Sequence, residues 1–148
     1  MKRYCLGFAL STDRDCRTYV ALIRKTKPEW QAGFLNGIGG SLEPEDHGFP
    51  RVAMAREFYE ETGFPNHDSW WTPFCEMQFE HALVSCFVIR LDWDQFESLS
   101  SPTEETVEKI LVDRVEAFKA LPNLAWLIPM AQAFQTNPAL PYLTIKTQ

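Results

Sequence analysis

The chain has 148 residues, of which 45% are hydrophobic and 14% aromatic, and its formal net charge is −6. This length and composition exclude a disordered protein and predict one domain, residues 1–148, with a hydrophobic core that needs no disulfide or metal cross-links. The negative charge argues against a protein that binds nucleic-acid backbones, so we expect no nucleic-acid partner. It leaves nucleotide substrates open, because bound metal ions bring positive charge.

Apolar runs and turn residues divide the chain into expected elements. In chain order we expect strands at 4–10 and 17–24, a long loop over 25–40, a helix over Pro50–Thr62, strands at 74–79 and 82–91, a polar surface loop over 92–105, a strand at 106–112, a helix over 123–135 and a last strand at 142–146. The strand at 82–91 is nearly all apolar, so we place it in the centre of the sheet. This order predicts an α/β fold in which a mixed β-sheet is sandwiched between helices (α/β/α).

The cysteines and the N-terminus indicate the compartment. The four cysteines have no metal-ligand or disulfide-scaffold spacing, and Cys86 lies in an apolar run that predicts a buried thiol. The N-terminus leads straight into an expected strand, and no apolar run is long enough to cross a membrane. We therefore expect a cytoplasmic protein with no membrane partner.

The most informative stretch is the helix over Pro50–Thr62, which carries three carboxylates on about one turn. Residues three and four apart share a helix face, so Glu60 and Glu61 both lie near Glu57. An isolated Glu-Glu pair is usually a solvated face, but these residues follow Arg56 and a glycine-rich loop at 35–40. A hard divalent cation bound by carboxylate and carbonyl oxygens would neutralise the crowded charges.

Other residues of this helix have structural explanations. Gly63 is expected to be the C-cap that ends the helix. The apolar residues recur at helical spacing and are expected to pack in the core. These residues are Val52, Ala55, Phe58 and Tyr59.

The glycine loop and the carboxylates together resemble the Nudix box, whose pattern is G-x5-E-x7-R-E-U-x-E-E-x-G-U, with U aliphatic or aromatic. Residues 56–64 match every fixed position of its second half. In the first half, Asp46 is the sixth residue after Gly40 and stands where the family has Glu. Nine residues instead of seven then separate Asp46 from Arg56. Because the first Glu of the family mainly supports the helix through its partner Arg, this departure concerns loop geometry more than chemistry.

The resemblance implies a fold, a reaction and a metal. Nudix proteins cleave a nucleoside diphosphate linked to another moiety with water and usually Mg²⁺, for which Mn²⁺ is the expected substitute. Carried over by position, Glu57, Glu60 and Glu61 would bind the metal together with the Gly39 carbonyl oxygen. Arg56 would orient Glu57 through a charge-assisted hydrogen bond.

The general base has alternative candidates. One of the motif glutamates is one candidate, and a carboxylate of the loop before the strand at 106–112 is another. The loop candidates are Glu104 and Glu105, for which exposed loop charges are the competing interpretation.

Substrate recognition depends on residues outside the box. Residues 35–40 are similar to the W-N-G-F-G-G of the MutT-like oxidised-purine nucleoside triphosphatases, in which the Asn binds the purine. This similarity implies base recognition by Asn36 and a substrate contact at Gly40, with a left-handed turn residue as the alternative for Asn36. Trp30 stands where that group has a stacking aromatic residue, with a small satellite core as the alternative.

The C-terminal part resembles the W-P-D-D…P segment of the same group. Asn123 replaces an Asp that reads the base, and Leu121 replaces the stacking Trp. Trp126 either compensates for this loss or packs in the core. A pocket and a homodimer interface are both open interpretations for Leu124, Trp126 and Leu127.

These observations favour a Mg²⁺-dependent Nudix pyrophosphohydrolase. The expected reaction converts a nucleoside triphosphate, with a purine deoxynucleotide favoured and an oxidised base left open, to the monophosphate and pyrophosphate. One alternative is a pyrophosphatase for ADP-ribose, a dinucleotide or a nucleotide sugar, which the short chain disfavours. Another is a non-catalytic nucleotide sensor, which has no need for three crowded carboxylates.

Overall fold

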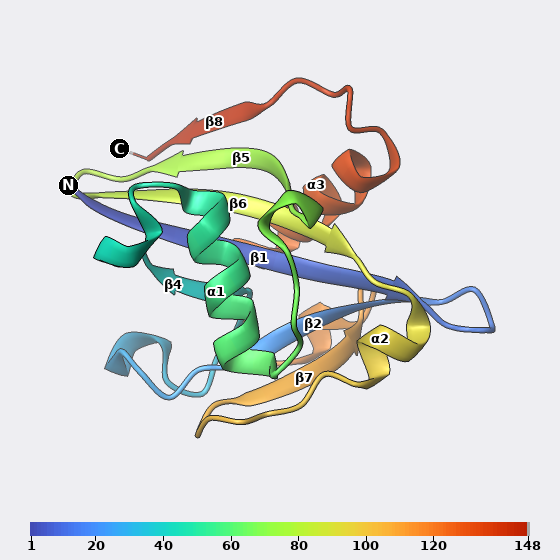
Figure 1. The fold of residues 1–148 in the computed structure, drawn as a ribbon. Helices are drawn as coiled ribbons and strands as arrows, with labels where there is room; N and C mark the ends of the chain where they lie inside the picture. The colour runs from blue at the N-terminus through green and yellow to red at the C-terminus, as the bar shows by residue number, and fades with distance from the viewer. Residues whose placement is uncertain (148) are drawn as a thin grey trace.

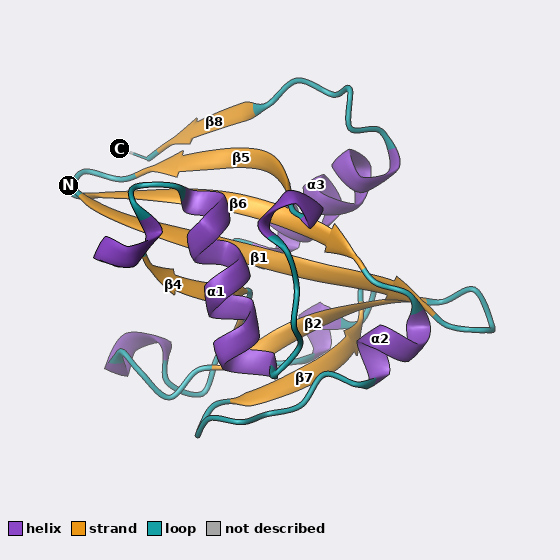
Figure 2. Ribbon diagram, viewed as in Figure 1, coloured by secondary structure: helices purple, strands orange, loops and turns teal. Residues whose placement is uncertain are grey.

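The structure is a computed structural model that describes residues 1–147, which form eight strands and three α-helices. The strands are β1 (Lys2–Thr12), β2 (Thr18–Arg24), β3 (Leu35–Asn36), β4 (Ile38–Ser41), β5 (Thr72–Gln78), β6 (Ala82–Arg90), β7 (Thr106–Leu111) and β8 (Leu143–Lys146). The helices are α1 (Pro50–Thr62), α2 (Trp93–Glu97) and α3 (Leu124–Thr136) (Figures 1 and 2). No helix within residues 1–147 has the length and apolar character that crossing a bilayer requires.

The strands form one mixed sheet in the order β3-β2-β1-β6-β5-β8, with β4 beside β1 and β7 beside β2. β1 runs parallel to β6, while its first half pairs antiparallel with β4 and its second half pairs antiparallel with β2. β6 lies between β1 and β5, which confirms the expected central position of this apolar strand. The expected α/β fold with a mixed sheet between helices is also confirmed.

Helices cover both faces of the sheet, with α1 in front of it and α3 behind it in Figure 1. Side chains of β1 alternate between the two faces, as the period of a strand requires. Leu6, Phe8 and Leu10 belong to the core under α3. Cys5 and Ala9 belong to the core under α1, where their small size lets the helix pack closely on the sheet.

Two segments that we expected to be loops contain regular structure. The 25–40 segment contains β3, β4 and a short 3-10 helix at Glu29–Gln31. The strands were missed because they have only two and four residues and include two glycines, which leaves no alternating signal. The 92–105 segment contains α2, which begins with a capping box between Asp92 and Gln95 and buries Phe96.

The core predictions for α1 are confirmed at Phe58 and Ala55, while Val52 is partly exposed and belongs to neither core cluster. Phe58 is buried, Ala55 packs partly against the core, and Gly63 ends the helix in the left-handed conformation with φ 73°. Tyr59 was predicted to be a core residue, but its side chain is exposed. It directly follows Phe58, so the helix turn points the two side chains in different directions.

The structure also tests the predictions for Cys86 and for the C-terminal half of the chain. Cys86 is a buried free thiol, as expected. α3 and β8 begin one residue later than predicted. Leu127 is fully buried in the core under α3, so it lines neither a pocket nor an interface.

Candidate active site at the contact of α1 and β4

The candidate site lies where α1 crosses β4. Two glycines of β4 make this contact possible, because any side chain on them would collide with a neighbour. A Cβ at Gly40 would lie 2.6 Å from Oε1 and 2.9 Å from Oε2 of Glu57. A Cβ at Gly39 would run into the backbone carbonyl of Cys5 on β1. The Glu57 carboxylate therefore rests directly on the Gly40 backbone.

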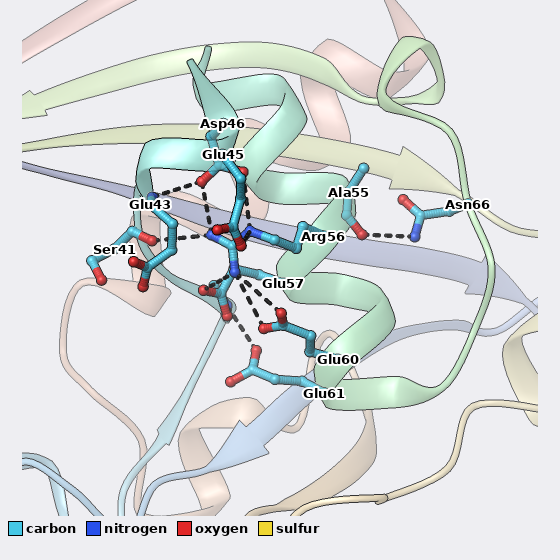
Figure 3. A network of polar contacts seen from close by, with 11 residues as sticks. Ser41, Glu43, Glu45, Asp46, Ala55, Arg56, Glu57, Glu60, Glu61 and Asn66 are labelled. Carbon is cyan, nitrogen blue, oxygen red and sulfur yellow. Dashed lines mark hydrogen bonds and ion pairs between the residues drawn. The ribbon is translucent and has the colours of Figure 1, made fainter. Parts of the chain in front are cut away.

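Arg56 is the centre of a polar network at the start of the site (Figure 3). Its Nε donates to Asp46 Oδ1 at 3.0 Å, and its Nη2 donates to Asp46 Oδ2 at 2.8 Å. Its Nη1 donates to Glu57 Oε1 at 3.1 Å and to Glu60 Oε2 at 3.2 Å. Nη2 also reaches the Ser41 carbonyl oxygen at 3.2 Å, so one guanidinium joins α1 to the end of β4.

Asp46 is the buried partner that supports Arg56. Its side chain is 1% exposed and also accepts the Glu43 backbone N–H at 2.7 Å. The hydrogen bond from Arg56 holds the pKa of the Asp46 carboxyl below its ordinary value. The longer loop is absorbed by a 3-10 helix at Pro44–Asp46, followed by left-handed residues at His47 and Gly48.

Two carboxylates of α1, Glu57 and Glu61, are only partly compensated by the protein, since Arg56 pairs with Glu57 and a single backbone N–H reaches Glu61. Burial raises the pKa of Glu57, and the nearby Glu60 and Glu43 raise it further against the lowering effect of Arg56. Burial and the neighbouring Glu57 raise the pKa of Glu61 to about 8. Glu61 Oε2 accepts one backbone N–H, from Gly39 at 3.1 Å. A cation placed between these groups would lower both pKa values.

The donor chemistry at Glu57 and Glu61 fits a hard divalent cation, since both groups offer carboxylate oxygens at a site of uncompensated negative charge. Glu60 is arranged differently from the expectation. Its side chain is 51% exposed and pairs with Arg56. Within residues 1–147, no three His, Cys, Asp or Glu side chains are already placed to hold a metal ion. Glu60 would have to leave Arg56 to join the other two carboxylates.

The loop candidates for a general base have different environments. Glu104 is exposed, as expected for a loop charge, whereas Glu105 is only 6% exposed. Glu105 is paired with Lys25, and the charges of both residues influence the pKa of Glu61. Sequence reasoning missed Lys25, although the antiparallel pairing of Arg24 with Thr106 in β2 and β7 is what brings the two residues together.

The residues expected to bind the base lie on three segments. Asn36 is in β3 and has no left-handed backbone, so the turn interpretation is wrong; its amide donates to Gln31 Oε1 at 3.3 Å. Trp30 is 69% exposed, which excludes the satellite-core interpretation. β3 also bridges to Ala120, and the Leu121 N–H donates to the Leu35 carbonyl oxygen, so the segment before α3 runs beside Asn36.

The segment before α3 bears the remaining candidates. Asn123 precedes the helix, and its Oδ1 is buried without a hydrogen-bond partner among residues 1–147. Leu121 and Leu124 line a pocket of about 260 Å³ between this segment and the helix. Trp126 is 41% exposed, so the core interpretation of this residue is wrong.

Comparisons with known proteins place this geometry in a known fold. Neither a protein-family model nor a curated protein sequence matches the chain. The NUDIX domain of Shewanella oneidensis NrtR, solved with ADP ribose, matches with a TM-score of 0.71 and 13% identity over 90% of this chain and 87% of that one. A MutT structure from work on Aliivibrio salmonicida and Vibrio cholerae matches with a TM-score of 0.66 and 14% identity, covering 90% and 98%. The Ap4A hydrolase of C. elegans matches with a TM-score of 0.67 and 12% identity, covering 91% and 98%.

These likenesses show that the chain has the Nudix fold. Some similar proteins are longer, since the chain spans 64% of the complete NrtR chain and 42% of a MutT/nudix family protein from Enterococcus faecalis. NrtR has also been solved in complex with a 27mer DNA, so the Nudix fold occurs in a protein that binds nucleic acid.

Proposed function

We propose that the chain is a Nudix hydrolase that uses Mg²⁺ to cleave a nucleoside triphosphate to the monophosphate and pyrophosphate. The observation that carries the proposal is the pair of partly buried, like-charged carboxylates with raised pKa values at Glu57 and Glu61, which are placed over Gly39 and Gly40, with Arg56 supporting Glu57. A purely structural helix would gain nothing from this charge. The Nudix fold of the chain and the match of residues 56–64 to the Nudix box support the same conclusion.

Each residue of the site has a proposed role. Glu57 and Glu61 hold Mg²⁺, Glu60 joins them on leaving Arg56, and the Gly39 carbonyl supplies a further oxygen. The bound cation would neutralise phosphate charge and lower the pKa of an attacking water. Arg56 keeps the Glu57 carboxylate directed at the cation, because Asp46 fixes the other edge of the guanidinium.

The proposed substrate class depends on the base-binding residues. The Asn36 amide and the Asn123 oxygen, which has no hydrogen-bond partner among residues 1–147, offer the donor and acceptor groups that read the edge of a base, and Trp30 offers an exposed face for stacking. We propose a purine nucleoside triphosphate on these grounds. A homodimer, a cytoplasmic location and the absence of nucleic-acid partners stay predictions.

Two other functions have an observation in their favour. Cleavage of ADP-ribose is favoured by the complex of the NrtR domain with ADP ribose. A nucleotide sensor without catalysis is favoured by the pairing of Glu60 with Arg56, which leaves two of the three motif glutamates facing one another.

The test is turnover of a panel of compounds with and without Mg²⁺, with the products separated by chromatography. The panel contains the canonical and oxidised (d)NTPs, ADP-ribose and a dinucleotide. We expect a triphosphate to yield monophosphate and pyrophosphate, with Mn²⁺ replacing Mg²⁺. Glu60→Gln serves as the variant that should lose this activity. The matched control is Glu45→Gln, because Glu45 is 68% exposed and lies 3.8 Å from the same arginine.

The outcomes separate the three functions. Turnover of ADP-ribose without turnover of any triphosphate would replace the proposed substrate. Binding of dGTP with no turnover of any compound would establish the sensor. Equal turnover by Glu60→Gln and the native protein would show that Glu60 is not a ligand of the catalytic metal.

A further inference from the structure

Glu105 lies outside the Nudix motif, in the segment between α2 and β7, yet its carboxylate is almost wholly buried. Both of its oxygens are engaged. Oε2 accepts the Thr26 backbone N–H at 2.6 Å and the Thr26 hydroxyl at 3.1 Å, while Oε1 accepts from Lys25 Nζ at 3.2 Å. Three donors, one of them charged, therefore fix this carboxylate in one orientation.

The donors stand at the beginning of a loop that spans residues 25–34. The ends of this loop are tied by the Lys25 N–H to the Phe34 carbonyl at 2.9 Å and by the Gly33 N–H to the Lys25 carbonyl at 2.7 Å. Trp30 lies on the turn between these ends, and Gln31 accepts from Asn36. The position of the loop thus determines where the two proposed base-binding residues stand relative to each other.

The same contact stands beside the carboxylates of α1. The charges of Lys25 and Glu105 both act on Glu61, the cation lowering and the anion raising its pKa. The loop that carries Trp30 is consequently held at the edge of the candidate active site. Connecting loops are ordinarily the mobile part of a binding site. A buried carboxylate that fixes the 25–34 loop by hydrogen bonds therefore needs an explanation.

We propose that Glu105 is a positioning residue that latches the 25–34 loop for substrate binding and takes no proton from the attacking water. The inference rests on the proposed function, because the ligand that the loop would serve is the nucleotide bound there. A general base needs a free lone pair within reach of a water, and loop donors occupy three of the roughly four lone-pair positions of the Glu105 carboxylate. The Thr26 N–H and the Lys25 ammonium also outweigh burial and hold the pKa of Glu105 below its ordinary value, which weakens it as a base.

The experiment compares Glu105→Gln with Glu97→Gln, which alters an exposed carboxylate of α2 outside the candidate site. Hydrogen–deuterium exchange of peptides covering residues 25–34 measures how firmly Glu105 holds the loop. KM and kcat for the best triphosphate of the panel measure the effect of this contact on substrate binding and turnover. Loss of charge-assisted bonds of this kind corresponds to a change of about tenfold. For Glu105→Gln we therefore expect exchange and KM each to rise about tenfold, with kcat within about twofold of the native value. Glu97→Gln should change none of them.

Thr26→Val provides a second variant that removes only the hydroxyl donor. Thr26 is exposed, so the fold tolerates this change, and we expect a smaller shift in exchange and KM in the same direction. Unchanged exchange in both variants would overturn the latch. A fall of kcat by about 100-fold at unchanged KM would instead make Glu105 the base.

The latch and the proposed function fail in different ways. If no panel compound is turned over, the exchange measurement still decides whether Glu105 holds the loop. The dissociation constant of dGTP in Mg²⁺ then takes the place of KM, and Glu105→Gln should raise it about tenfold. A rise in exchange with unchanged nucleotide affinity would leave Glu105 as a structural group and overturn its role in binding.

Discussion

Two carboxylates near the same edge of the sheet, the partly buried Glu61 on α1 and the buried Glu105 before β7, have opposite electrostatic states. Glu105 accepts three donors, including the Lys25 ammonium, and its pKa is lowered. Glu61 accepts one backbone N–H and has Glu57 as a neighbour, and its pKa is raised to about 8. Burial penalises the charge of both groups, so the difference lies in how the chain compensates that charge.

This comparison distinguishes a carboxylate that stabilises the fold, Glu105, from a carboxylate that is available to bind a ligand, Glu61. A buried charge with a complete set of donors stabilises the fold and gains nothing from a cation. A buried charge with a like-charged neighbour costs stability until a cation arrives. The comparison therefore predicts that equivalent substitutions at the two residues have opposite effects on stability.

The largest expected effect is at the carboxylates of α1. Glu61→Gln should reduce Mg²⁺-dependent turnover by about 10³-fold, because it removes a charged ligand of the cation. The same substitution should raise the free energy of unfolding of the metal-free protein by about 1–2 kcal/mol at pH 8, since it removes an uncompensated charge. Turnover assays and urea unfolding without metal measure the two effects. A less stable Glu61→Gln protein would contradict the comparison.

The second prediction concerns the pH dependence of stability without metal. The folded pKa of Glu61, about 8, lies above the ordinary value of 4.5, so the folded protein keeps a proton that the unfolded chain loses between these values. Stability from this group is therefore fully present below about pH 4.5 and is lost as the pH rises to 8. We expect urea unfolding to show a fall of about 2 kcal/mol or more between pH 5 and pH 8.

Two additions sharpen this measurement. Glu61→Gln should flatten the fall, and saturating Mg²⁺ should oppose it by binding only the folded protein. Glu105 and Asp46 have lowered pKa values, so their contributions act in the other direction and are lost at acid pH. An identical slope in Glu61→Gln and the native protein would show that another group titrates.

The third prediction tests the support of the site at Asp46. Asp46→Asn removes the charged partner from the Nε and Nη2 contacts of Arg56, and Asp46 is 1% exposed. We expect the free energy of unfolding to fall by about 2 kcal/mol, measured from the urea midpoint. Glu45→Gln alters an exposed carboxylate beside the same arginine and should change it by less than about 0.5 kcal/mol. Equal losses in the two variants would show that Asp46 is not the support.

Much of the fold was predictable from the sequence because its signals are local. The apolar run of β6, the glycine that ends α1 and the spacing of the motif glutamates each depend on neighbouring residues. The short strands β3 and β4 were not predictable in this way. They pair with β2 and β1, and the two glycines of β4 are explained only by the approach of Glu57 and Cys5.

In the candidate site, too, the features that depend on the spacing of neighbouring residues were predictable, and those that depend on side-chain conformation or on distant residues were not. The carboxylates of α1 follow from a helical period, but the pairing of Glu60 with Arg56 depends on a choice of side-chain conformation that the spacing does not determine. Lys25 and Glu105 are 80 residues apart and meet because β2 pairs with β7. No local pattern marks such a contact, and the competing interpretation of Glu105 as an exposed loop charge was accordingly wrong.

The smallest expected effect on stability, and a clean test of binding, is at Trp30. Its side chain is 69% exposed, so Trp30→Ala should change the free energy of unfolding by less than about 0.5 kcal/mol. Stacking on a base is worth roughly 1–3 kcal/mol, so KM for the preferred triphosphate should rise about tenfold while kcat stays the same. Trp70→Ala is the matched control, because Trp70 is 50% exposed on a different 3-10 helix. A KM that responds equally to both substitutions would remove Trp30 from the binding site, and the latch at Glu105 would then have to act through Asn36 alone.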